Sequence, residues 1–225
     1  MLAKLPFRAI VFDLDGTLVD TLPDIHEALN RSLSEVGLPE IGEAACRNMI
    51  GGGAHNLIEQ AFTLIGESSD NPRIDPVFAR FIALYEAEPA VRSHPFPGAV
   101  AALEALREQG IALGICSNKP HALTEMVLED LKLKLFFGDA VIGGDALPTR
   151  KPDAGHLLEV IKRLGHPPSA ALMVGDSATD VGAARNAGIP IIAVDFGYTN
   201  TPAAELGADA LISHFDSLLD TISAL

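Results

Sequence analysis

The stretch Asp13-Leu14-Asp15-Gly16-Thr17-Leu18-Val19-Asp20 directly follows an apolar run over residues 7–12. That run is long enough for a buried strand and too short for a helix. Two carboxylates therefore stand where a strand ends, and in open α/β sheets the carboxyl edge is where ligands bind. Asp13 is a candidate nucleophile, because a carboxylate with an ordinary pKa of about 3.9 is ionised at neutral pH. Asp15 is a candidate acid/base, and an Asx turn with both carboxylates in solvent is the open alternative.

Strands and helices alternate in the second half of the chain. Apolar runs predict strands at residues 111–116, 140–143, 170–174 and 190–194, with a short edge strand at 210–212. Helical spacing of apolar residues predicts helices through residues 100–106 and over 122–131, 153–164 and 178–187. This alternation predicts an α/β fold with a doubly wound parallel sheet, a Rossmann-like core.

A purely helical block separates the first strand from the rest of the sheet. Helical spacing covers residues 23–37, 43–50, 54–65 and 76–86, and no strand pattern interrupts it. The stretch Pro95-Phe96-Pro97-Gly98 marks a linker. We therefore expect an inserted all-helical cap domain over residues 21–95 and a catalytic core made of residues 1–20 and 96–225.

Composition narrows the classes of partner. The 225-residue chain is 48% hydrophobic and carries a net charge of −14, which argues against nucleic acid or an anionic membrane as partner. The two cysteines, Cys46 and Cys116, lack metal-type spacing and suggest a reduced, cytoplasmic protein. No signal-peptide pattern or membrane span is recognisable. We expect a cytoplasmic protein, monomeric or homodimeric.

Polar residues follow three further apolar runs. Ser117-Asn118-Lys119 follows the 111–116 run, where a hydroxyl and an amide can hold phosphate oxygens or cap a helix. Lys151 precedes a proline at a helix entrance, where a cation indicates that an anion sits nearby, although it could be a solvated surface lysine. Asp176 and Asp180 are four residues apart, so their like charges favour a hard-metal site, with helix capping as the alternative.

Taken together, these four stretches resemble the motifs of the haloacid dehalogenase-like superfamily, most of whose members are magnesium-dependent phosphatases. The motifs occur in the family's order, each after an apolar run, and they span nearly the whole chain. The resemblance implies that Thr17, Ser117 and Asn118 bind phosphate, whereas a role for Lys119 stays open. It makes Lys151 the residue that neutralises both Asp13 and the transferring phosphoryl group.

The resemblance also implies a cofactor and a mechanism. Mg²⁺ is bound by the carboxylates of Asp13 and Asp176 and the backbone carbonyl of Asp15, while Asp180 acts as a second carboxylate that orients a ligand or a water. Asp13 forms an aspartyl-phosphate, and Asp15 acts as acid and then as base. A receiver-type phospho-accepting domain or a phosphate-binding module is the non-enzyme alternative, although a receiver domain is about half as long as this chain.

The cap indicates the substrate. Arg47 and the glycines Gly51, Gly52 and Gly53 are candidates to bind a small carboxylate, with a flexible turn and a solvated arginine as the alternatives. This arrangement is similar to the cap of bacterial phosphoglycolate phosphatases, which implies hydrolysis of 2-phosphoglycolate, a small phosphorylated metabolite, to glycolate. A sugar-phosphate phosphatase, such as one acting on N-acetylmuramic acid 6-phosphate, is the alternative, followed by a phosphosugar mutase.

Overall fold

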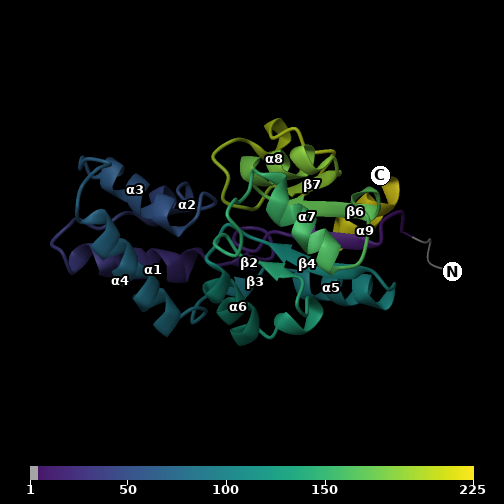
Figure 1. Cartoon of the computed structure of the whole chain (residues 1–225), viewed down its shortest axis with the longest axis horizontal. Coiled ribbons are helices and arrows are strands. Elements are labelled where there is room, and N and C mark those ends of the chain that lie inside the picture. Colours follow the sequence, from purple (N-terminus) through teal and green to yellow (C-terminus); the bar gives the residue numbers. More distant parts are fainter. Residues whose placement is uncertain (1–4) are drawn as a thin grey trace.

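The computed structural model describes residues 5–225 and contains one parallel six-stranded sheet (Figure 1). The strand order is β5-β4-β1-β6-β7-β8, so the chain extends the sheet first on one side of β1 and then on the other. All five strand pairings are parallel. The predicted doubly wound sheet is confirmed, including its short edge strand. The strands are β1 (Ala9–Phe12), β4 (Ala112–Cys116), β5 (Val141–Ile142), β6 (Ala171–Gly175), β7 (Ile191–Val194) and β8 (Ala210–Ile212).

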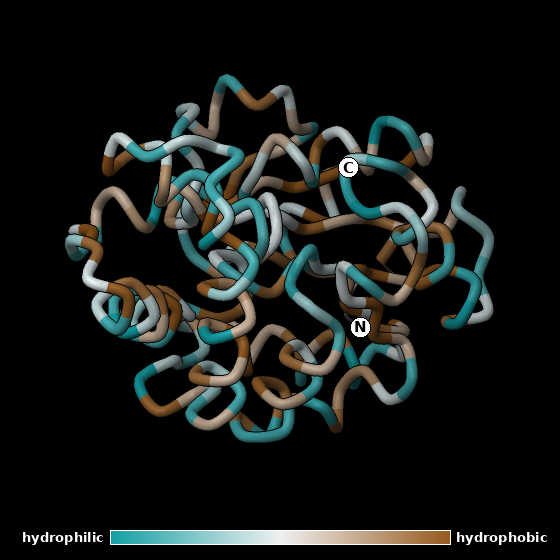
Figure 2. The backbone as a smooth tube through the Cα atoms, turned by 60° about the vertical axis from the view of Figure 1, so that its left-hand side comes forward, coloured by the Kyte–Doolittle hydropathy of each residue, from teal (hydrophilic) through white to brown (hydrophobic). Residues whose placement is uncertain are grey.

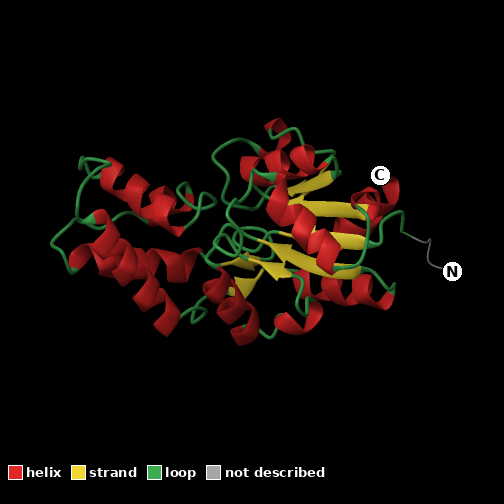
Figure 3. Ribbon diagram, in the orientation of Figure 1, coloured by secondary structure: helices red, strands yellow, loops and turns green. Residues whose placement is uncertain are grey.

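Helices cover both faces of this sheet (Figure 3). Successive side chains of β1 point to opposite faces of the sheet. Ile10 and Phe12 join the buried cluster on one face, whereas Ala9 and Val11 join the cluster on the other. The first cluster includes residues of α5 (Ala99–Glu108), α6 (His121–Asp130) and α9 (Leu218–Ala224). The second includes residues of α7 (Ala154–Arg163) and α8 (Ala178–Ala187). A strand buried on both faces explains why residues 7–12 read as an unbroken apolar run.

Four helices form a separate unit at the left of Figure 1. They are α1 (Leu22–Ser34), α2 (Glu43–Arg47), α3 (Ala54–Leu64) and α4 (Ile74–Ala87). Their apolar faces share a third buried cluster, in which α1 packs on α4 and α4 packs on α3. The helix predicted over residues 43–50 is shorter than expected, because the chain leaves the helical conformation before Gly51, whose φ is +112°. Figure 2 shows hydrophobic and hydrophilic segments alternating along the helices, as amphipathic packing requires.

A short antiparallel ribbon, absent from the sequence-based expectation, joins the helical unit to the sheet. β2 (Val19–Asp20) pairs with β3 (His94–Pro95). The two crossings between the sheet and the helical unit therefore lie side by side. No sequence pattern predicted this ribbon, because two-residue strands are too short to show a period.

The remaining elements are short. Helix α9 was not predicted, and four 3₁₀ turns complete the described chain: η1 (Lys134–Phe136), η2 (Pro168–Ala170), η3 (Ala203–Glu205) and η4 (Phe215–Ser217). Among residues 5–225, no helix combines the length and the apolar character needed to cross a bilayer.

Candidate active site

The site lies at the carboxyl edge of the three central strands. β4, β1 and β6 are neighbours, so the residues that follow them meet above the sheet edge: Ser117, Asp13 and Asp176. Gly16 turns the chain after Asp13 with a φ of +83°, and a Cβ there would lie 2.6 Å from Asp176 Oδ2. A glycine is therefore needed for both the backbone conformation and the close approach.

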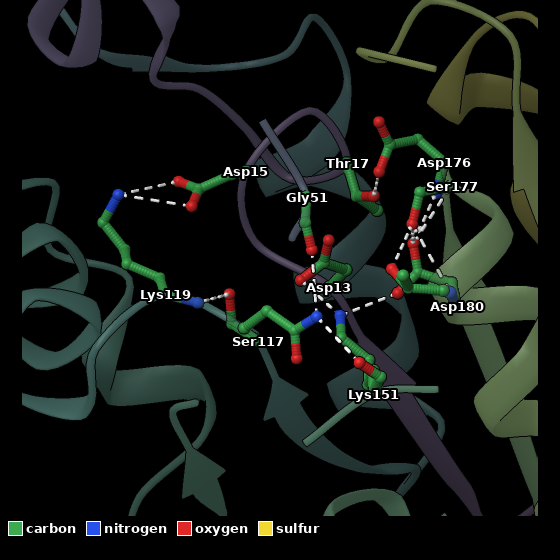
Figure 4. A network of polar contacts seen from close by, with 12 residues as sticks. Asp13, Asp15, Thr17, Gly51, Ser117, Lys119, Lys151, Asp176, Ser177 and Asp180 are labelled. Atoms are coloured by element: carbon green, nitrogen blue, oxygen red, sulfur yellow. Dashed lines mark hydrogen bonds and ion pairs between the residues drawn. The ribbon is translucent and has the colours of Figure 1, made fainter. Parts of the chain in front are cut away.

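Three carboxylates converge at this edge (Figure 4). One oxygen from each of Asp13, Asp176 and Asp180 lies within 4.8 Å of the others, and all three residues are buried. Burial raises the pKa of Asp13 to about 7, although the Lys151 ammonium opposes the shift. Burial and the neighbouring carboxylates Asp180 and Asp13 raise the pKa of Asp176 well above its ordinary value. Such a concentration of buried oxygen ligands suits a hard divalent cation, which would stabilise their charged forms.

Lys151 provides a positive charge inside this cluster. Its Nζ lies 2.8 Å from Asp13 Oδ1 and 2.7 Å from Asp180 Oδ1, and the residue is 2% exposed. Burial disfavours the ammonium, but the two carboxylates outweigh it and raise the lysine pKa. Lys151 is therefore a fixed, charged group facing Asp13, not a solvated surface lysine.

Asp180 combines helix capping with positioning. Ser177 is the N-cap of α8, and its hydroxyl and backbone N–H both donate to Asp180 Oδ2, at 2.5 and 3.0 Å. The same oxygen accepts the backbone N–H of Asp176 at 3.2 Å. The helix capping that was the alternative reading of Asp180 is therefore present together with the ionic role. The same carboxylate takes part in the cap of α8, accepts the Asp176 backbone N–H and pairs with Lys151.

Asp15 lies in a second ionic group, on the other side of Asp13 (Figure 4). Lys119 Nζ contacts both of its carboxylate oxygens, at 3.0 and 3.2 Å, and the Thr21 hydroxyl donates to Oδ1 at 2.7 Å. Lys119 also donates to the hydroxyl of Tyr85 at 2.7 Å. Burial lowers the pKa of Lys119, and Asp15 opposes that shift.

A cavity opens between the sheet edge and the helical unit. Its floor is acidic and polar, and its opposite wall is mostly apolar. The core contributes Asp13, Asp15, Ser117, Asn118, Lys119, Pro120 and Leu123, and the helical unit contributes Ile25, Ile50, Gly51, Gly53, Ala54, Leu57, Phe81 and Tyr85.

Comparison with known proteins identifies the family. The family model described as haloacid dehalogenase-like hydrolase matches residues 10–194. The chain belongs to the haloacid dehalogenase-like hydrolases. It is 43% identical to a phosphoglycolate phosphatase of Rhodospirillum rubrum over 217 residues, which cover 95% of this chain and 90% of that protein. It is 42% identical to a phosphoglycolate phosphatase of Agrobacterium fabrum, over 92% of this chain and 89% of the relative.

A solved structure of this hydrolase family agrees. The crystal structure of a predicted phosphoglycolate phosphatase from Haemophilus somnus superposes with a TM-score of 0.90 and 30% identity, covering 97% of this chain and 99% of that one. These comparisons confirm the family expected from the four motifs and the expected enzyme class, a phosphatase.

The structure of this hydrolase brings most of the predicted site residues to one place, and their roles stay predictions. Asn118 links the two parts of the molecule, because its amide donates to the carbonyls of Gly51 and Lys151 at 2.9 and 3.0 Å. Thr17 is fully buried and donates to Asp176 Oδ1 at 3.1 Å, so in this structure its hydroxyl holds a carboxylate.

Two predicted cap residues are not among those that line the cavity. The Arg47 guanidinium stacks over the ring of Tyr198, 5.1 Å from its centroid, and lines no part of the cavity wall described above. Gly52 does not line that wall either, whereas Gly51 and Gly53 do.

Two residues of this site, Tyr85 and Tyr198, were not predicted from the sequence, and the role of a third, Lys119, was left open. Lys119 directly follows Ser117 and Asn118, and this position beside two predicted phosphate-binding residues was the only indication of a role. Tyr85 and Tyr198 come from α4 and the loop after β7, and no local pattern relates either position to Asp13.

Proposed function

We propose that this hydrolase is a magnesium-dependent phosphatase that forms an aspartyl-phosphate on Asp13 and hydrolyses 2-phosphoglycolate to glycolate. The observation that carries the proposal is the buried group of Asp13, Asp176 and Asp180 with Lys151 between two of them. That group supplies a nucleophile, oxygen ligands and a cation at the carboxyl edge of one sheet.

The residues fit Mg²⁺. It prefers oxygen ligands, and the buried Asp13 and Asp176 carboxylates, with raised pKa values, gain from a nearby cation. We assign these two carboxylates and the backbone carbonyl of Asp15 as its protein ligands, with Asp180 supporting Asp176. Bound magnesium would supply positive charge that offsets the repulsion between the nucleophile and a phosphate.

In the first step we assign, an Asp13 oxygen attacks phosphorus in line. A new O–P bond forms as the bond to the leaving oxygen breaks, and protonated Asp15 gives its proton to that oxygen. Lys151 stays charged beside Asp13 and stabilises the negative charge on the transferring group. In the second step Asp15 takes a proton from a water, whose oxygen attacks phosphorus and releases Asp13 and inorganic phosphate.

We assign phosphate binding to the residues at the strand ends. Ser117 and Asn118 line the same cavity as Asp13, so we assign them to contact a phosphate carried by Asp13. We also assign a phosphate contact to Thr17. Its hydroxyl donates to Asp176 in this structure, so it would have to rotate to reach a phosphate.

The cap is part of the proposal. We assign residues 21–95 to a cap and residues 1–20 and 96–225 to the core. The β2–β3 ribbon at the two crossings supports this division, as does the buried cluster that α1–α4 share, which Leu123 and Tyr198 of the core also join. The cavity wall supplied by the cap is apolar at Ile25, Leu57 and Phe81, which favours a small substrate over a sugar with many hydroxyl groups. The names of the two bacterial relatives support phosphoglycolate as that substrate.

A phosphate-release screen tests the substrate. We expect magnesium-dependent turnover of 2-phosphoglycolate, with a lower kcat/KM for sugar phosphates and for N-acetylmuramic acid 6-phosphate. A reversed order would transfer the assignment to a sugar-phosphate phosphatase. The absence of turnover on all of them by a folded, magnesium-loaded protein would favour a phosphate-binding module.

A substitution tests the mechanism. Asp13→Asn keeps the size of the side chain and removes the nucleophile, so we expect turnover to fall at least about 1,000-fold while the far-UV circular dichroism stays unchanged. A rate near that of the unsubstituted protein would exclude a phosphorylated Asp13.

Arg47→Ala and Gly52→Ala test the predicted cap contacts. Unchanged substrate selectivity in both variants would assign substrate recognition to other residues. The oligomeric state, predicted to be a monomer or a homodimer, can be measured by light scattering.

A further inference from the structure

Tyr198 makes three sets of contacts that the mechanism above does not use. It lies in the loop after β7 and is 3% exposed. Its backbone N–H donates to Asp176 Oδ2 at 2.7 Å, so it holds a proposed metal ligand directly. The packing is close, because a Cβ on Gly197 would lie 2.2 Å from Asp176 Cβ and a Cβ on Gly16 would lie 2.8 Å from the Tyr198 ring.

The Tyr198 hydroxyl holds the first crossing into the helical unit. It accepts the backbone N–H groups of Thr21 and Leu22, at 2.8 and 3.0 Å, and donates to Asp20 Oδ1 at 2.5 Å. The first amides of a helix have no partner within it, and the usual remedy is a side chain at the N-cap. Thr21 is the N-cap of α1, but its own hydroxyl bonds to Asp15 instead. A tyrosine distant in the sequence therefore caps α1 together with Asp20, whose Oδ1 also accepts the Leu22 N–H, at 3.3 Å.

The same loop contacts the helical unit at α2. The Arg47 guanidinium lies over the Tyr198 ring, and Asn200 Nδ2 donates to the carbonyl of Asn48 at 3.0 Å. Tyr198 thus touches Asp176 with its backbone, the start of α1 with its hydroxyl and α2 with its ring. A rigid, buried side chain with hydrogen bonds at its far end transmits a displacement of its backbone to that end, because close packing leaves neither end room to relax.

We propose that Tyr198 is a positioning residue that couples divalent-cation binding at Asp176 to the seating of the helical unit on the core. The inference rests on the proposed metal site. A cation that fixes the Asp176 carboxylate also fixes the N–H donor of Tyr198, and its hydroxyl then holds the start of α1. Coupling of this kind is reciprocal, so a well-seated cap must also tighten cation binding.

Tyr198→Phe removes the hydroxyl and keeps the ring and the backbone N–H on Asp176. Tyr85→Phe is a matched control, because Tyr85 is the other tyrosine of the chain and its buried hydroxyl bonds to Lys119, not to Asp176 or to the amides of Thr21 and Leu22. The measurements are hydrogen exchange of the amides of Thr21 and Leu22 with and without Mg²⁺, and Mg²⁺ affinity by calorimetry, both without substrate.

In the unsubstituted protein and in Tyr85→Phe, we expect Mg²⁺ to slow exchange at these two amides at least about fivefold. In Tyr198→Phe we expect that response to disappear and Mg²⁺ affinity to fall by a similar factor. A purely structural role would lower the melting temperature and leave the magnesium response in place. That outcome, an equal magnesium effect on both amides in Tyr198→Phe, would overturn the coupling while leaving the metal site intact.

Arg47→Met provides a second variant if Tyr198→Phe does not fold. Arg47 is half-buried, and the substitution keeps much of its aliphatic chain while removing the guanidinium from the Tyr198 ring. We expect it to weaken the magnesium response about twofold, as the loss of about 0.5 kcal/mol of cation–π energy implies, and an unchanged response in it would count against the proposal. An unsubstituted protein that binds no Mg²⁺ would overturn the proposed metal site, and the coupling with it. The two failures are therefore distinguishable by calorimetry.

Discussion

Lys151 Nζ lies 2.8 Å from Asp13 Oδ1 and 2.7 Å from Asp180 Oδ1, so a single buried ammonium joins the carboxylate that follows β1 to one in the first turn of α8 (Figure 4). The two carboxylates therefore share one cation. Removing one partner of a buried ion pair leaves an uncompensated charge, which costs far more than a surface pair is worth. This relationship predicts that catalysis and stability depend on Lys151 together.

Lys151→Met is expected to lower the free energy of unfolding by about 3 kcal/mol and kcat by at least about 100-fold. The double variant Lys151→Met/Asp180→Asn removes one of the uncompensated charges, so it should regain part of the stability and none of the activity. Urea unfolding and phosphate release measure the two effects. A single variant as stable as the unsubstituted protein would contradict the ion-pair argument.

Magnesium should stabilise the fold as well as support turnover. A cation bound only by the folded state at 100 times its Kd adds about 2.7 kcal/mol to the free energy of unfolding, which thermal unfolding detects as a higher Tm. Asp176→Asn should lose this gain, and EDTA should abolish activity. Asp139→Asn is the control, because Asp139 is exposed and precedes β5 at the opposite edge of the sheet. An equal magnesium-induced rise in Tm in both variants would place the ion elsewhere.

Gly53→Ala should weaken substrate binding. Gly53 has a φ of +93°, and a Cβ there would lie 3.2 Å from the carbonyl oxygen of Asn118 and 3.1 Å from the Arg150 guanidinium. We expect KM to rise severalfold, because the added methyl group pushes the cap loop from the core, and stability to fall by about 1 kcal/mol from backbone strain.

A matched control isolates this contact. Gly66 has a φ of +83° and no atom within 4 Å of its Cβ position, so Gly66→Ala carries similar strain without the crowding. Its stability should fall by a similar amount while KM stays unchanged. A rise in KM in both variants would show that strain in the cap, not the contact with Asn118, controls binding.

His156 should make the fold less stable in acid. The residue is fully buried, and burial and the Lys151 ammonium lower its pKa below the ordinary 6.5. The unfolded chain therefore binds this proton more readily than the folded one, so its contribution to stability is full above about pH 6.5 and is lost as the pH falls toward the folded pKa. His156→Gln should flatten the pH dependence of urea unfolding between pH 7 and 5 relative to the unsubstituted protein. Parallel pH profiles would exclude His156 as the source.

Local sequence patterns predicted the parts of the fold that depend on short-range order. Unbroken apolar runs marked β1, β4 and β6 because these strands are buried on both faces, and helical spacing marked α1 to α4. The motif residues Asp13, Ser117 and Asp176 could be placed at one edge, because parallel strands end on the same side of a sheet. Burial within these strands is what leaves the pattern in the sequence.

Contacts between distant segments left no such pattern. The β2–β3 ribbon, the pair of Lys119 with Asp15 and the capping of α1 by Tyr198 each join residues far apart in the chain. Arg47 and Gly52 stay predictions as substrate contacts. In this structure Gly51 and Gly53 line the cavity, and the Arg47 guanidinium lies over the Tyr198 ring.

The amino-acid sequence by itself determined the α/β class, the helical insertion, the family and the acidic motifs, because periodicity and strand-end residues are local properties of a chain. Only the tertiary structure decided which charges meet: Lys151 with Asp13 and Asp180, Lys119 with Asp15, and Tyr198 between Asp176 and α1. The reason is physical, since buried ions are stable only beside specific partners, and packing rather than sequence distance brings those partners together.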